Sequence, residues 1–179
     1  MAEVEIHTGH GESHDSFGQS VGILAGIIGV LLAIVTILSH REHTAAVVHK
    51  TEANDQWAFY QAKKIREHNE EIGAGLLTAL APDPAKVAAL SERFSQEQQR
   101  YAREAEAIRQ EAEARGTQSE DAERRALRLD IAEGFLELGL VMSSLYFVSR
   151  RRFFVAFGGA AALIGTLFAI SAAIPWALH

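Results

Sequence analysis

Three long runs of the chain carry almost no charge, and they restrict its fold more than any other feature. Residues 17–39, 131–149 and 153–176 are predominantly apolar, and the only charged side chains among them are Glu133 and Glu137. A helix needs roughly 20 mostly apolar residues to cross the hydrocarbon layer of a bilayer. The runs therefore exclude a single water-soluble globule and predict an all-α membrane protein with three transmembrane helices.

The overall composition conceals this division, because its averages resemble those of an acidic soluble domain. The formal net charge is −6 and the mean hydropathy is +0.02. Nearly all of the 17 basic and 23 acidic side chains lie outside the three runs. Cysteine is absent from the sequence, which excludes disulfides, thiolate catalysis and thiolate metal sites.

Residues 1–16 form a polar tail without lysine or arginine. A short terminal stretch with no apolar pattern is predicted to be disordered. Its histidines, His7, His10 and His14, are weak candidates for a metal site, because ordering a flexible tail around an ion costs conformational entropy. We therefore predict no metal and no other cofactor. The apolar run after the tail is too long for a signal-peptide core and has no basic flank before it, so we interpret it as an uncleaved anchor.

The charged segment between the first two spans, residues 40–130, is interpreted as a helical hairpin. The outgoing arm contains no proline before Leu80, and Pro82 and Pro84 then predict a turn at residues 81–84. Such an arm can carry a coiled-coil seam if apolar positions recur in heptads. Two series of positions repeat every seven residues in the outgoing arm: Ala58, Ile65 and Ile72, and, four residues after each, Ala62, Asn69 and Leu76.

The returning arm carries a similar pattern. Its heptad positions are Val87, Phe94, Tyr101 and Ile108, joined by Leu90, Gln98, Ala105 and Ala112. Gly116 and the capping-box pattern of Thr117 with Glu120 predict a break near residue 116, after which a helix restarts and runs into the second span. The heptad patterns and lengths of the two arms predict a long antiparallel coiled-coil hairpin, which would project roughly 60 Å from the membrane.

The loop between the second and third runs, residues 150–152, consists of three arginines. Positive residues in short loops are retained in the cytoplasm, whereas long domains translocate largely regardless of charge. This rule places the amino terminus and the loop in the cytoplasm, and residues 40–130 outside it. A count of the flanking charges alone favours the opposite orientation, because the tail has no basic residue and several lie at the hairpin side of the spans: Arg41, Lys50, Arg124, Arg125 and Arg128.

Residues 54–65, with the sequence NDQWAFYQAKKI, resemble the signature of a family of bacterial membrane proteins catalogued as domain of unknown function 4337. The arginine loop followed by Phe153 and Phe154 is similar as well. The resemblance covers nearly the whole chain in layout. It implies a polar tail rich in histidine, one span, a charged helical segment and a carboxyl-terminal pair of spans, in a bacterial inner membrane. It implies no activity.

Four side chains of this segment are candidate contacts with a partner: Asn54, Trp57, Tyr60 and Gln61. Asn54 and Gln61 fall on one helical face, and Trp57 and Tyr60 fall on an adjoining one. The aromatic pair would form an exposed contact patch. The alternative is structural, with polar seam residues that fix the register of the arms and aromatic rings that fill gaps between them.

Glu133 and Glu137 are the candidate intramembrane acids. Their spacing of four places both carboxylates on one helical face. Ionisable residues inside a span are costly and often mark an ion or proton path. Both lie in the first two turns of their span, so the alternative is an interfacial position or a bond to a neighbouring helix. No other acid or histidine in the spans completes a relay, which argues against a pump or transporter.

The first span also carries a glycine stripe. Gly18, Gly22 and Gly26 recur every four residues, and Gly29 follows three later. Small residues at this spacing let helix backbones approach closely in lipid. The stripe predicts helix packing, either between copies of the chain or among its own three spans. Both interpretations predict that Gly22→Leu disrupts assembly.

These features favour a non-enzymatic membrane scaffold or accessory subunit, which self-associates through its spans and presents the coiled-coil hairpin to other proteins. Its expected partners are membrane lipid and either further copies of the chain or the other subunits of a larger membrane complex. Nucleic acid is excluded as a partner, because acidic and basic residues are interspersed along the hairpin and leave no basic face. The alternative is a small oligomeric channel or ion-coupled subunit that uses Glu133 and Glu137.

Overall fold

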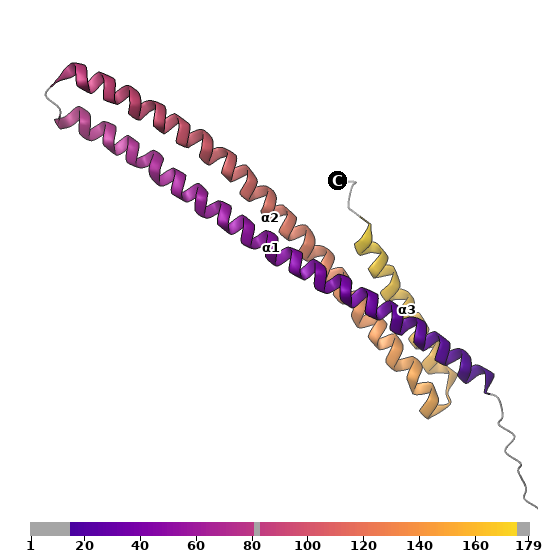
Figure 1. The fold of residues 1–179 in the computed structure, drawn as a ribbon. Coiled ribbons are helices and arrows are strands. Elements are labelled where there is room, and N and C mark those ends of the chain that lie inside the picture. The colour runs from indigo at the N-terminus through magenta and orange to yellow at the C-terminus, as the bar shows by residue number, and fades with distance from the viewer. Residues whose placement is uncertain (1–14, 81–82, 175–179) are drawn as a thin grey trace, which may run out of the picture. The chain divides into compact units, whose positions relative to one another are not determined.

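The computed structural model describes residues 15–80 and 83–174, and all regular structure within them is helical (Figure 1). Helix α1 spans Ser16–Leu80, α2 spans Pro84–Ser149 and α3 spans Arg152–Ala173. The predicted all-α class is confirmed. The tail histidines, the residues Ala81 and Pro82 of the predicted turn, and the end of the third predicted span lie outside the described residues.

Each of the three helices contains a stretch that is long and apolar enough to cross a membrane. Each helix contains all or most of one of the three apolar runs of the sequence, and the residues of these stretches are mostly not buried within the chain. The chain divides into two compact units, to both of which α1 and α2 contribute. The three-helix unit comprises the described residues up to 37 and from 128 onward, and the hairpin unit comprises residues 38–127.

In the hairpin unit, α1 and α2 run antiparallel (Figure 1), and contacts between them follow one another from Glu42 to Gly73 of α1. The residue numbers of the contacts rise along α1 and fall along α2, as expected for antiparallel helices. The contacts are Glu42 with Arg125, Ala46 with Ser119, Glu52 with Arg115, Lys63 with Glu104, and Gly73 with Phe94. The arms therefore have one defined alignment, held by ion pairs and by close packing of small residues.

Of the residues in the predicted seam of the returning arm, Ala105 and Ala112 are buried. The predicted seam of the outgoing arm is wrong. Ile65, Ile72 and Leu76 are exposed by 61%, 48% and 55%, and Ala58, Ala62 and Asn69 are exposed as well. The ionic residues decide the pairing, because Glu42, Glu52 and Lys63 must face the side chains of opposite charge on α2, and this turns the apolar series outward.

The predicted break near residue 116 is also wrong, because α2 continues through Gly116 without interruption. Thr117 does not cap a new helix; its hydroxyl donates to the carbonyl of Glu113, one turn back, at 3.1 Å. A glycine inside a helix costs only about 1 kcal/mol relative to alanine. The seam on either side of it, with Ala112 and Ser119 buried, offsets that cost.

The three-helix unit has a core of α1, α2 and α3 residues, in which small side chains are frequent. The buried core contains Ile28, Val35, Leu129, Ala132, Leu136, Ala162 and Ala172. Helices α2 and α3 are joined by only two residues, and the first of them, Arg150, adopts a left-handed conformation with φ of 56°. Its N–H donates to the carbonyl of Tyr146 at 2.7 Å, which closes the end of α2. The predicted basic loop is thus shorter by one residue, because Arg152 begins α3.

Candidate functional site

Three glycines bring the backbones of α2 and α3 close together. A Cβ at Gly158 would lie 2.7 Å from the carbonyl oxygen of Gly139, and one at Gly139 would lie 2.8 Å from that of Gly158. A Cβ at Gly165 would lie 2.8 Å from the carbonyl oxygen of Ala132. Only glycine fits at these positions. The sequence analysis did not single out Gly139, which belongs to no regular glycine stripe.

The glycine stripe of the first run lies elsewhere. Added Cβ atoms at Gly22, Gly26 and Gly29 would have no neighbouring atom of the described chain within 4 Å, beyond the adjacent residues and their own helix turn. Gly18 is buried, and its closest contact is with the side chain of Asp15. Gly22, Gly26 and Gly29 therefore do not hold the three helices of one chain together. Packing between copies remains the prediction for them.

Glu133 and Glu137, the candidate intramembrane acids of the sequence, have different surroundings. The hydroxyl of Thr36 on α1 donates to Glu133 on α2 at 2.7 Å, across two helices of the three-helix unit. Glu133 is half-buried, whereas Glu137 is exposed. The two carboxylates therefore do not converge on one internal site within the chain. For Glu133, the geometry matches a bond between neighbouring helices.

A second cluster in the three-helix unit was not predicted and joins the start of α1 to the turn between α2 and α3. Asp15 precedes α1 and accepts a hydrogen bond from the N–H of Gly18 at 2.9 Å, as a helix N-cap. Its other carboxylate oxygen pairs with Arg150 at 2.5 Å. Phe17 packs edge-on against Tyr146, with ring centroids 5.1 Å apart, and Arg152 lies over the Phe17 ring at 4.7 Å.

The N-cap bond from Gly18, assisted by Arg150, holds the pKa of Asp15 below its usual range. The carboxylate therefore stays charged at neutral pH, in contact with the arginine of the turn. An acid immediately before a helix was the available sequence signal for this cap. Its pairing with Arg150, 135 residues later, had no such signal.

The candidate contacts in residues 54–65 do not form one site within the chain. Trp57 and Tyr60 pack edge-on against each other with ring centroids 5.5 Å apart. Tyr60 is half-buried, whereas Asn54 and Gln61 are exposed. The aromatic pair is therefore local to α1, and the two amides are available on its surface.

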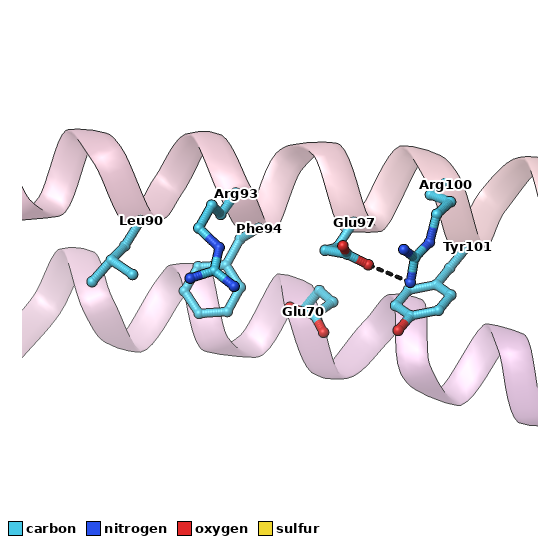
Figure 2. Close-up of a pocket in the computed structure, with 7 residues that line it drawn as sticks. All are labelled: Glu70, Leu90, Arg93, Phe94, Glu97, Arg100 and Tyr101. Atoms are coloured by element: carbon cyan, nitrogen blue, oxygen red, sulfur yellow. Dashed lines mark ion pairs between the residues drawn. The ribbon is translucent and has the colours of Figure 1, made fainter.

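An open pocket of about 450 Å³ lies in the hairpin unit nearer its turn (Figure 2). Figure 2 shows Phe94 and Tyr101 reaching from α2 toward α1, with arginines and glutamates around them. Arg100 pairs with Glu97 at 2.6 Å and lies 4.9 Å from the centre of the Tyr101 ring. Because carboxylates accompany the arginines, the pocket has no strong preference for a charged ligand. The residues that line it are Glu70, Leu90, Arg93, Phe94, Glu97, Arg100 and Tyr101.

Comparison with known proteins identifies the family of this chain. A family model, described as a domain of unknown function, matches residues 17–175. The chain belongs to the DUF4337 family. The resemblance inferred from residues 54–65 is thereby confirmed. No curated protein and no solved structure matches this chain.

The described part of this DUF4337 chain contains no group of three or more histidine, aspartate or glutamate residues arranged to hold a metal ion. Within it, His49 contacts Glu52 and His68 contacts Glu71. The weak metal candidates of the tail, His7, His10 and His14, lie outside the described residues.

Acidification is expected to weaken the returning arm of the DUF4337 hairpin. Hydrogen bonds from Arg109 and Gln110 lower the pKa of Glu106 from 4.5 to about 2. A carboxyl whose pKa is lower in the folded state favours folding above its ordinary pKa, and this contribution is lost as the pH falls toward the lowered value. The thermal unfolding temperature of the full chain in detergent should therefore fall between pH 4.5 and pH 2.

The matched variant for this prediction is Glu106→Gln, which removes the titrating group and keeps the length of the side chain. Its unfolding temperature should depend less steeply on pH over the same interval. A dependence identical to that of the unmodified chain would contradict the assignment to Glu106. Since the pair is exposed, we expect the difference to be small.

Proposed function

We propose that this DUF4337 protein is a non-enzymatic integral protein of the bacterial inner (cytoplasmic) membrane. It crosses the bilayer three times, self-associates through its spans, and presents the hairpin as a coiled-coil scaffold or accessory subunit to other proteins. The observation that carries this proposal is the outer surface of the three-helix unit, on which large apolar side chains are exposed.

The outward residues of this unit are large and apolar on all three helices. Ile23 and Val30 of α1, Val141 of α2, and Leu163 of α3 are all more than half exposed. Where the backbones of α2 and α3 approach closely, the residues in contact are glycine and alanine, as at Gly139 and Ala162. In water this surface would be unfavourable, at roughly 25 cal/mol for each Å² of apolar area. In lipid it costs nothing, and packing of small residues is what holds membrane helices together.

The hairpin supports a role in protein contacts and not in chemistry. Its acidic and basic side chains pair along and between the helices, as at Arg109 with Glu106 and Glu113 and at Arg115 with Glu52. A surface of alternating, mutually paired charges has no basic face for nucleic acid. It is well suited to contacts with other helices, which use interspersed charges to select partner and register.

A small oligomeric channel or ion-coupled subunit is the second candidate. The exposed position of Glu137 favours it, since an oligomer could turn this carboxylate toward a central water-filled path. The bond from Thr36 to Glu133 favours the scaffold, because it engages one of the two acids between neighbouring helices.

We also propose that the amino terminus and residues 150–152 lie in the cytoplasm and that the hairpin lies outside it. The ion pair between Asp15 and Arg150 supports a common side for the start of α1 and the arginine turn. Short, positively charged loops are retained in the cytoplasm. Because the chain has no cysteine, single cysteines at Glu111 and at Arg151 would report the two sides through an impermeant thiol reagent.

The function is tested by mild extraction of the native protein from membranes, followed by measurement of its mass and of the proteins that accompany it. The scaffold proposal expects a defined oligomer or a complex with other membrane proteins. Recovery of a single chain with no companion would overturn it. Ion flux in vesicles that is lost in Glu137→Gln would instead establish the channel.

A further inference from the structure

Helix α1 of the hairpin unit has an apolar face that α2 does not cover. We name as the outer stripe six positions that repeat with heptad spacing: Ala58, Ala62, Ile65, Asn69, Ile72 and Leu76. All six are exposed, although the spacing is that of a helix seam. The same positions were predicted to face the returning arm, so their apolar character still lacks a partner.

Helix α2 cannot be the partner of the outer stripe in this fold. The adjoining face of α1 is engaged by α2 through Glu52 and Lys63, which pair with Arg115 and Glu104. At Gly73, the ring of Phe94 lies so close that a Cβ would be 3.1 Å away. To bring the outer stripe onto α2, α1 would have to rotate and break these contacts.

We propose that the outer stripe pairs with the outer stripe of a second copy of this chain, in parallel and in register. The six positions carry no charge, so two copies can approach along their full length. Asn69 lies in the middle of the stripe, and its amide both donates and accepts hydrogen bonds. The same side chain on a second copy satisfies it, and a single asparagine of this kind specifies register in parallel coiled coils.

The charges beside the stripe are compatible with this pairing. In a parallel coiled coil, the residue directly before Ala62 or Asn69 faces the residue five positions later on the other helix. Gln61 would therefore face Arg66, and His68 would face Gly73. No two like charges oppose each other. The nearby lysines are already engaged, Lys63 with Glu104 and Lys64 with Glu67.

The direction of pairing rests on the proposed function. Copies whose spans share one bilayer all send α1 into the hairpin unit from the same side, so neighbouring outgoing arms are parallel. The stripe is thin, with alanine at two of its six positions, and it needs a high local concentration of copies. Confinement to a membrane supplies that concentration, as a tether does for linked binding sites.

Thiol cross-linking of the full chain in reconstituted vesicles tests the inference, since the native sequence has no cysteine. The variants are Ala62→Cys and Ile72→Cys on the stripe, and the control is Glu111→Cys, which is exposed on α2. We expect both stripe variants to form covalent dimers under mild oxidation several-fold more than the control. Yields equal to that of the control would overturn the inference, as would cross-links to a different protein in native membranes.

Two further variants examine the stripe and its direction. Adding Ile65→Asp to each stripe cysteine should reduce its cross-linking to the control level, with helicity by circular dichroism unchanged, because Ile65 is exposed within the chain. A mixture of Ala62→Cys and Leu76→Cys should give no mixed dimer. An antiparallel pair centred on Asn69 would bring these two positions together, so abundant mixed dimers would overturn the parallel arrangement.

An alkaline wash of the same vesicles separates this inference from the proposed function. A chain that resists the wash and forms a defined oligomer, but does not cross-link at Ala62 or Ile72, would refute the stripe and leave the membrane scaffold standing. A chain that the wash releases would refute the membrane assignment, whatever the cross-linking yields.

Discussion

Gly158→Leu is expected to destabilise the three-helix unit by about 3 kcal/mol, at the upper end of the range for overpacked interiors. A Cβ at this position would lie 2.5 Å from the hydroxyl oxygen of Ser143 and 2.9 Å from its backbone nitrogen. The carbonyl oxygen of Gly139 would be 2.7 Å away. Two of these three atoms belong to the backbone of α2, which cannot move aside as a side chain can. Helix α3 must therefore shift away from α2 along its length.

The measurement is thermal unfolding of the full chain in detergent, followed by circular dichroism. Gly22→Leu is the matched control, because a Cβ at Gly22 meets no neighbouring atom within 4 Å. The control should leave unfolding of the single chain unchanged and weaken only self-association. Equal losses of stability in both variants would show that the α2–α3 contact is not the tight one.

Ala112→Leu is expected to separate the two arms of the hairpin locally, at a cost of about 1–3 kcal/mol. Ala112 is fully buried in the face of α2 that packs on α1. Its neighbours along this face, Arg115 and Ser119, bond across to Glu52 and to the carbonyl of Ala46. Three additional carbon atoms do not fit between helices held this close, so these two contacts should lengthen or break.

Amide hydrogen exchange, resolved along the hairpin, measures this effect, because it reports local opening as well as global unfolding. The control is Ala114→Leu, an identical substitution at an exposed position two residues away on the same helix. Exchange should accelerate around residues 105–119 and around their partners on α1 in the first variant only. Unchanged exchange in Ala112→Leu would mean that the arms are more loosely packed than the burial of Ala112 indicates.

The helical class and the three candidate spans were predictable because they depend on local properties. Apolar runs near 20 residues long and the absence of proline from residues 41–80 act through the chain's own backbone. The face by which α1 meets α2 was not predictable in this way. A heptad of apolar residues indicates that a partner exists and does not identify it. On α1, the face toward α2 is largely polar, and its partners are chosen by charge.

For the candidate sites, too, local features were predictable from the sequence and contacts between helices were not. The spacing of Gly18, Gly22 and Gly26 is conspicuous within one segment, whereas Gly139 belongs to no such stripe. The close contact of Gly139 with Gly158 depends on where α3 meets α2, which no single segment encodes. For Glu133, the sequence supplied the acid and the possibility of a bond between helices. Its donor, Thr36, lies 97 residues away and carries no pattern of its own.

The ion pairs across the hairpin have a consequence for misalignment. Arms lined with alanine can slide past each other by a heptad and keep similar apolar contacts. Such a slip would place Glu52 opposite Ile108 or Ala122 instead of Arg115. A half-exposed ion pair contributes little to the free energy of folding, about 0–1 kcal/mol. Every shifted alignment nevertheless loses this ion pair and is therefore disfavoured. The main effect of these charges is to select one alignment of the two arms.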